Sequence, residues 1–199
     1  MRIKYDINLD IWNKCTLQCM QCARQSNTFI NSGQARSKPM SMSDWKKIVD
    51  HYKDSINFCG QVSDPVLHPQ LDKILKDTYE RNIKTKVSTA VSQKPFNWYK
   101  KCFEANPKAA WVFGLDGLPH QSHIYRKNQD GEKLFEIMKM AKEMGLKVIW
   151  QWIIFNYNQN DIDYGILLAE SKGMDIVFTQ SNRWWQMEHL KPDAEFLPT

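Results

Sequence analysis

The sequence predicts an α/β protein whose parallel sheet curves into a partial, open (β/α)6 TIM-like barrel. Short apolar segments alternate with helical patterns in six repeats of roughly 25 to 30 residues, which is typical of parallel strands joined by helical crossovers. At 199 residues the chain is too short for a complete (β/α)8 barrel, which takes about 250 residues. A hydrophobic content of 42 % suits one domain with a buried core.

The individual elements follow from local signals. Short apolar or alternating runs bounded by turn residues indicate the strands. Ser43 is the predicted N-cap of the first helix, with Asp44 in its first turn. Pro69 opens the second helix at a position that tolerates proline, while Gly145 and Gly173 end the last two. In chain order we expect a strand over 5–12, an irregular polar stretch over 13–42, a helix over 43–54, a strand over 56–60, a helix over 69–82, a strand over 84–89, a helix over 96–105, a strand over 109–115, a helix over 131–144, a strand over 147–155, a helix over 161–172 and a strand over 175–179.

Charge and hydropathy narrow the class of protein. The formal net charge of +5, from 27 basic and 22 acidic side chains, is mild and favours an anionic substrate over nucleic acid. No apolar run approaches the roughly 20 residues that span a bilayer. The first residues lack the apolar segment of a signal peptide. We therefore expect a cytoplasmic protein with no membrane contact and no nucleic-acid partner.

Cysteines are clustered in the loop after the first predicted strand. Cys15, Cys19 and Cys22 have the spacing C-x3-C-x2-C, and the odd total of five cysteines argues against a disulfide framework. Thiolates on one tight loop suit a soft metal centre, and three of them can hold three irons of a cubane. The fourth iron would stay open to an exogenous ligand. A structural zinc site is the alternative, but it needs four ligands, and residues 10–50 offer no fourth Cys or His.

With this spacing after the first strand of a partial barrel, the sequence resembles the radical S-adenosylmethionine (radical SAM) enzymes. The resemblance implies a [4Fe-4S] cluster on Cys15, Cys19 and Cys22, with the amino and carboxylate groups of S-adenosylmethionine on the open iron. Reduction would then break a C–S bond and yield a 5′-deoxyadenosyl radical that abstracts hydrogen from a substrate. A flavodoxin- or ferredoxin-type protein is the implied electron donor. Gln21 stands where the family usually has an aromatic residue near the adenine.

Other segments extend the resemblance over nearly the whole chain. Residues 58–69 resemble the family's glycine-rich segment, which meets the amino group of the cofactor's methionine, although the double glycine is missing and Asp64 replaces the usual Glu. Residues 113–117 resemble the Ser-Leu-Asp-Gly of members that modify peptides and proteins, with Gly114 in place of Ser. A nearby stretch ends in a similar Tyr-Arg, so Arg126 is expected to bind a carboxylate of cofactor or substrate. The cofactor-binding residues predicted from these matches and from the strand ends are Gln21, Gly60, Gln61, Asp64, Ser88, Thr89, Asp116, Arg126, Gln151 and Asn156.

The domain is expected to span residues 1–182, followed by a tail over 183–199 that covers the barrel mouth and keeps water from a radical. Relatives that modify peptides often carry a C-terminal Cys-rich domain. This sequence has no cysteine beyond Cys102, so no second cluster is expected. Cys59 and Cys102 are expected to be free thiols outside the cluster, with Cys59 at the end of the second strand, close to the expected site.

Three functions remain open at this point. A peptide or protein side chain is the first expectation for the substrate, because the matched motifs belong to that group. The second is a small metabolite or nucleotide, including deazapurine-type ring chemistry. The third is a non-catalytic barrel that keeps its cluster as a structural or electron-carrying module, which the altered glycine-rich segment motivates. The sequence assigns no residue to giving or quenching the substrate radical.

Overall fold

The computed structural model describes residues 6–31, 38–52, 54–185 and 187–197. Six strands form one parallel sheet, and each strand pairs with the next one along the chain. The sheet is open, since in these described residues the two end strands pair with a single neighbour each. The predicted partial barrel is thereby confirmed. The strands are β1 (Asp6–Asn8), β2 (Ser55–Cys59), β3 (Lys84–Thr89), β4 (Ala110–Gly114), β5 (Lys147–Ile153) and β6 (Asp175–Thr179).

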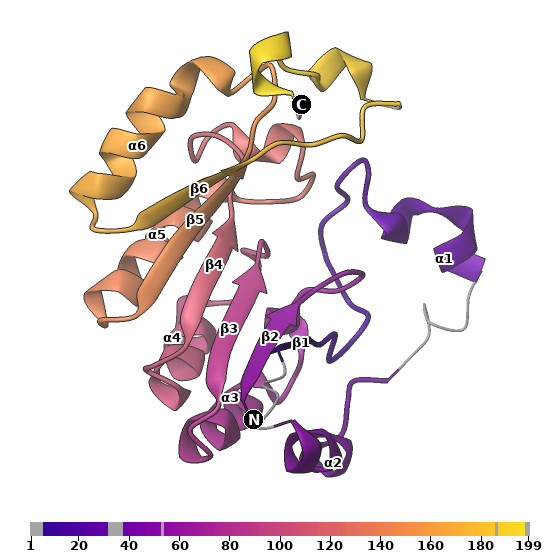
Figure 1. Ribbon diagram of the computed structural model, residues 1–199, viewed down its shortest axis with the longest axis vertical. Helices are drawn as coiled ribbons and strands as arrows, with labels where there is room; N and C mark the ends of the chain where they lie inside the picture. The colour runs from indigo at the N-terminus through magenta and orange to yellow at the C-terminus, as the bar shows by residue number, and fades with distance from the viewer. Residues whose placement is uncertain (1–5, 32–37, 53, 186, 198–199) are drawn as a thin grey trace, which may run out of the picture.

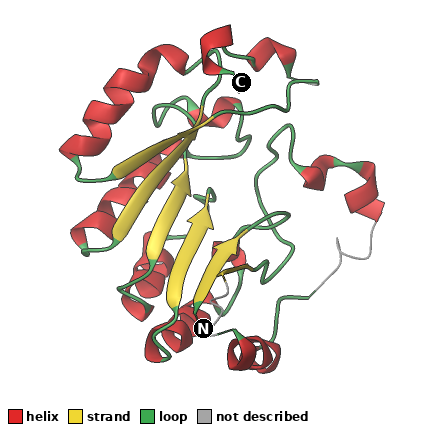
Figure 2. Cartoon of the chain, in the orientation of Figure 1, coloured by secondary structure: helices red, strands yellow, loops and turns green. Residues whose placement is uncertain are grey.

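Helices join the strands and cover one face of the sheet (Figures 1 and 2). The strand arrows in Figure 1 point toward the end of the sheet where the C-terminal tail crosses. This is the carboxyl end of the strands, where enzymes with βα barrels place their chemistry. The helices are α1 (Asn27–Asn31), α2 (Met42–His51), α3 (Leu71–Glu80), α4 (Phe96–Ala105), α5 (Gly131–Glu143) and α6 (Ile162–Ser171).

The observed elements differ from the predicted ones at a few ends. Ser41, not Ser43, caps α2, because its hydroxyl accepts the backbone N–H of Asp44 at 3.1 Å. The following helix, α3, begins two residues after Pro69, so the proline belongs to the preceding turn. The polar stretch over 13–42 also contains α1, a single turn too short to show a helical period. Of the first predicted strand, residue 5 lies outside the described residues and 9–12 are not strand.

Aromatic side chains fill the space between the sheet and its helices. Trp45, Trp111, Trp150 and Trp152 are fully buried. Each buried indole removes about 200 Å² from water, which is worth about 5 kcal/mol as an upper estimate. Along β5 every second residue is buried, so the strand packs one face against the helices and presents the other, including Gln151, to the barrel interior.

The tail packs against the carboxyl end of the sheet through a smaller apolar cluster. Trp184, Met187 and Leu190 are buried there with Phe155, and Trp184 meets the Phe155 ring edge-on at 5.9 Å between ring centroids. Cys19 of the predicted cluster loop also packs against this group. The tail therefore joins the loop that bears the cysteines to the end of β5. Within the described residues, no helix is long and apolar enough to span a membrane.

Candidate active site

A cavity of about 190 Å³ lies at the carboxyl ends of β2 to β5, and we call it the inner cavity. It collects residues from the cysteine loop and from the ends of these strands. Most of the residues that sequence analysis singled out are on its wall. The lining residues are Cys15, Leu17, Cys19, Cys22, Arg24, Cys59, Gly60, Gln61, Ser63, Asp64, Ser88, Thr89, Ala90, Val112, Gly114, Arg126 and Gln151.

The cysteine loop is tied to the neighbouring loops by hydrogen bonds that involve its backbone. Arg24 donates to the carbonyl oxygen of Asn13 and, at 2.7 Å, to that of Val62 in the loop after β2. The backbone N–H of Asp64 donates to the carbonyl of Lys14 at 2.8 Å. An irregular loop has few internal hydrogen bonds, so these contacts fix its position over the strand ends.

The thiols of Cys15, Cys19 and Cys22 are free and share one wall of the inner cavity. Burial raises the pKa of the Cys15 thiol to about 12 and also raises that of Cys19. Both thiols are therefore protonated at neutral pH until a metal displaces the protons. In the part of the chain that the structure describes, no three His, Cys, Asp or Glu side chains are gathered to hold one metal ion. A cubane needs a different arrangement, because each thiolate binds its own iron.

Asp64 is buried and its carboxylate joins the loop after β2 to the end of β3. One oxygen accepts the Thr89 hydroxyl at 2.8 Å and the N–H of Val66 at 3.2 Å. The other oxygen accepts the backbone N–H groups of Ala90 and Val91 at 2.8 and 3.1 Å. Burial raises the pKa of Asp64, and these hydrogen bonds oppose that shift. The carboxylate is thus engaged within the chain, and both Asp64 and Thr89 shape the cavity wall.

Gly60 occupies a turn that admits no side chain. A Cβ at this position would lie 1.6 Å from the carbonyl oxygen of Ser63. Asp10 holds the same turn from outside, accepting the Gln61 N–H at 3.0 Å and the Ser63 hydroxyl. The glycine-rich segment is therefore a tight turn whose backbone faces the cavity, although it has lost the second glycine of the resembled pattern.

Arg126 places a buried guanidinium on the cavity wall. It forms an ion pair with Asp116, with 2.7 Å between Nε and Oδ2, and that carboxylate also accepts the N–H of Ile153 at 2.8 Å. Burial raises the pKa of Asp116, and the positive charge of Arg126 opposes the shift. A Cβ on Gly114 would come within 2.8 Å of the Arg126 guanidinium. Gly114, which stands where the resembled motif has a serine, thus leaves room for the Arg126 side chain.

Three predicted cofactor residues do not line the inner cavity. Asn156 is exposed and its amide donates to the carbonyl of His189 at 2.7 Å, which anchors the tail. Gln21 lines a neighbouring cavity instead. Asp116 is fully buried behind Arg126 and reaches the inner cavity only through it. Gln61 and Ser88 line the inner cavity as expected from their strand-end positions.

Sequence reasoning missed several residues that shape the site. Arg24 and Asp10 act through backbone groups of other loops, and nothing in their local sequence pattern announces such contacts. Cys59, by contrast, was expected at the end of the second strand close to the site, and it lies on the wall of the same cavity as the other cysteines.

No protein-family model and no curated protein matches this sequence. Solved structures match over most of its length. Streptococcus suis SuiB bound to S-adenosylmethionine is 16 % identical, with a TM-score of 0.73 over 96 % of this chain and 44 % of SuiB. Native anSMEcpe with bound AdoMet is 15 % identical, with a TM-score of 0.66 over 88 % of this chain and 50 % of that one. Methylornithine synthase (PylB) is 12 % identical, with a TM-score of 0.62 over 90 % and 54 % of the respective chains.

The chain thus has the fold of these proteins, two of which are seen with S-adenosylmethionine bound. It spans about half the length of each of them. SuiB has also been captured with its precursor peptide SuiA, in a structure that matches this chain with a TM-score of 0.71 and 15 % identity.

Proposed function

We propose that this chain is a radical SAM enzyme in which Cys15, Cys19 and Cys22 hold a [4Fe-4S] cluster and S-adenosylmethionine binds beside it. The observation that carries the proposal is that all three thiols line one cavity together with the Gly60 turn and the guanidinium of Arg126. When bound, the cluster would pass one electron to the cofactor's sulfonium, releasing a 5′-deoxyadenosyl radical that removes hydrogen from a substrate. The fold shared with proteins that bind S-adenosylmethionine supports this assignment.

The chain's own residues divide the work of binding. Leu17, Ala90 and Val112 give the cavity an apolar lining that limits water near a reactive centre. Arg126 has five N–H donors, and Asp116 engages only the part of the guanidinium that faces it. The remaining donors suit a carboxylate, such as that of the cofactor's methionine. Ser88 and Gln151 add neutral polar groups from the ends of β3 and β5.

A peptide or protein side chain is the substrate we propose, and a flavodoxin- or ferredoxin-type protein is the proposed electron donor. SuiB bound to its precursor peptide and anSMEcpe bound to a Kp18Cys peptide are among the matching structures, which supports a peptide. Methylornithine synthase has the same fold and its name points to an amino acid instead. A small molecule is therefore the alternative outcome of the substrate test.

The cluster assignment is tested by anaerobic reconstitution with iron and sulfide, followed by dithionite reduction with S-adenosylmethionine. We expect cubane absorption and 5′-deoxyadenosine from the wild type, and loss of both when Cys15, Cys19 or Cys22 is changed to Ala. Cys102→Ala is the matched control, because this thiol is buried in α4 away from the cavity. A full cubane in any triad variant, or loss of iron in Cys102→Ala, would refute the ligand set.

The substrate is tested by deuterium transfer into 5′-deoxyadenosine. Deuterated candidate peptides and deuterated small molecules are each incubated with reduced, reconstituted enzyme, and the nucleoside is analysed by mass spectrometry. Transfer from a peptide supports the proposal, while transfer only from a small molecule assigns the alternative. A cubane that never yields 5′-deoxyadenosine with either class would favour a non-catalytic barrel.

A further inference from the structure

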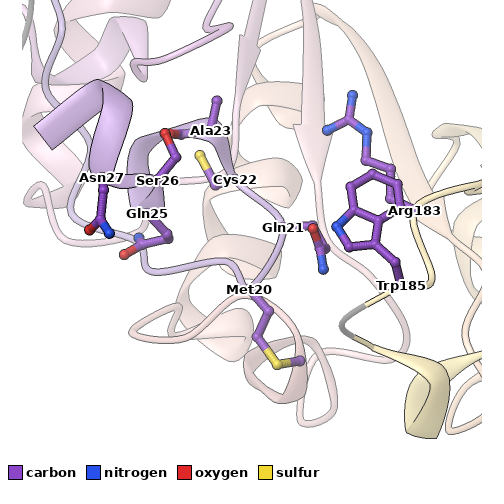
Figure 3. Close-up of a pocket in the computed structure, with 9 residues that line it drawn as sticks. All are labelled: Met20, Gln21, Cys22, Ala23, Gln25, Ser26, Asn27, Arg183 and Trp185. Atoms are coloured by element: carbon purple, nitrogen blue, oxygen red, sulfur yellow. The ribbon is translucent and has the colours of Figure 1, made fainter. Parts of the chain in front are cut away.

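A second cavity of about 620 Å³ opens beside the cysteine loop, and we call it the outer cavity. Figure 3 shows Arg183 and Trp185 of the tail on one side and the Cys22-to-Asn27 segment on the other. Cys22 lines both cavities, so the outer one meets the inner one at a predicted cluster ligand. The outer cavity therefore lies within reach of the chemistry but is built largely from residues that the proposed cofactor site does not use.

The outer cavity is large enough to hold a substrate. Ligand pockets for drug-sized molecules are about 300–1,000 Å³, and the outer cavity, at about 620 Å³, lies inside this range. A substrate that must sit next to the cluster ligand Cys22 therefore finds room there.

The charge on the wall of the outer cavity is positive. Arg183 is the cationic lining residue, and none of the described lining residues is Asp or Glu. Within the described parts of the chain, the Arg183 guanidinium forms neither an ion pair nor a hydrogen bond, and only its backbone N–H is engaged, by Ser181 at 3.2 Å. A free guanidinium on such a wall selects an anion, and a carboxylate matches its fork geometry.

Two neighbouring tryptophans of the tail differ in exposure. Trp184 is 9 % exposed and anchors the tail on Phe155, whereas Trp185 is 71 % exposed and lines the outer cavity. An exposed indole offers a flat apolar face on which a planar group can stack. Gln21 also lies on the wall of the outer cavity, where its side-chain nitrogen is buried, so this residue shapes the wall rather than binding the ligand.

We infer that the outer cavity is the substrate-selecting site, and that it takes a planar group bearing a carboxylate. Arg183 pairs with the carboxylate and Trp185 stacks on the planar group. The inference deepens the proposed function, on which it rests for the chemistry at Cys22. A peptide with adjacent aromatic and acidic residues and a free aromatic acid both offer this chemistry.

The test is binding to reconstituted protein labelled with 5-fluorotryptophan, read by fluorine NMR. The Trp185 resonance is assigned by its loss in Trp185→Phe. The peptide probes are acetyl-Tyr-Glu-amide and its Gln analogue, and the free probes are 4-hydroxybenzoate and 4-hydroxybenzamide. We expect the carboxylate of at least one pair to shift the Trp185 resonance and to bind about fivefold more tightly than its amide. The pair that shows this preference identifies the source of the ligand.

Arg183→Gln should abolish the preference for the carboxylate, and Arg183→Lys should retain part of it. Lys84→Gln is the matched control, since this exposed lysine begins β3 and lines neither cavity. Equal binding of acid and amide, an unmoved Trp185 resonance, or an unchanged preference in Arg183→Gln would overturn the inference. Displacement of the probes by S-adenosylmethionine would also overturn it, because the outer cavity would then be part of the cofactor site. Binding needs no turnover, so it is scored independently of whether 5′-deoxyadenosine forms.

Discussion

Removing the carboxylate of Asp64 should destabilise the protein by about 4 kcal/mol. The Asp64→Ala change leaves the backbone N–H groups of Ala90 and Val91 buried without the oxygen they now share. An unsatisfied buried donor costs about 2 kcal/mol, and two of them give the figure above. The Thr89 hydroxyl can rotate to a new partner, and the loss of the Val66 N–H bond at 3.2 Å is offset by relief of the buried carboxylate, so both are left out of the sum. The loss arises because one side chain holds the loops after two neighbouring strands together.

Urea unfolding of the apoprotein, followed by circular dichroism, measures this loss as a lower midpoint at an unchanged m-value. Asp175→Ala is the control, because its side chain is 62 % exposed and its pair with Lys147, at 3.6 Å, is screened by water. We expect that control to change stability by less than about 1 kcal/mol. A loss in Asp64→Ala no larger than in the control would refute the view that these hydrogen bonds hold the two loops.

Two further substitutions test the surroundings of the site. His68 is buried, its ring nitrogens lie 3.0 Å from the Met40 carbonyl and 3.2 Å from the Gln70 N–H, and burial lowers its pKa. Its stabilising contribution is therefore full above the unfolded pKa of about 6.5 and lost as the pH falls through the folded value. His68→Gln should flatten the decline in urea midpoint between pH 7.5 and 5.5, and parallel profiles would contradict the assignment. Gly114→Ala should lower the free energy of unfolding by about 2 kcal/mol, because the new methyl group crowds the Arg126 guanidinium. The same change should lower it by much less in an Arg126→Met background. Equal costs in both backgrounds, measured by the same unfolding assay, would mean that the strain lies elsewhere.

The order of strands and helices was predictable from sequence because it depends on local signals. The expected helix over 96–105 and the expected strands over 84–89 and 175–179 coincide with α4, β3 and β6. Helix ends were less certain where two capping residues compete, as with Ser41 and Ser43, since only the folded backbone shows which hydroxyl reaches the N–H of Asp44. The short helix α1 has too few residues to carry a period.

By itself the sequence determined which residue types reach the carboxyl end of the sheet. The spacing of Cys15, Cys19 and Cys22 on one loop, and the polar residues after successive strands, follow from chain order alone, because parallel strands deliver their ends to one edge. Only the tertiary structure decided which of these side chains share a cavity. It committed Asp64 to backbone donors, paired Arg126 with Asp116, turned Asn156 to the tail and placed Arg183 across the outer cavity from Cys22. These outcomes depend on contacts between residues far apart in the chain, and no local pattern encodes such contacts.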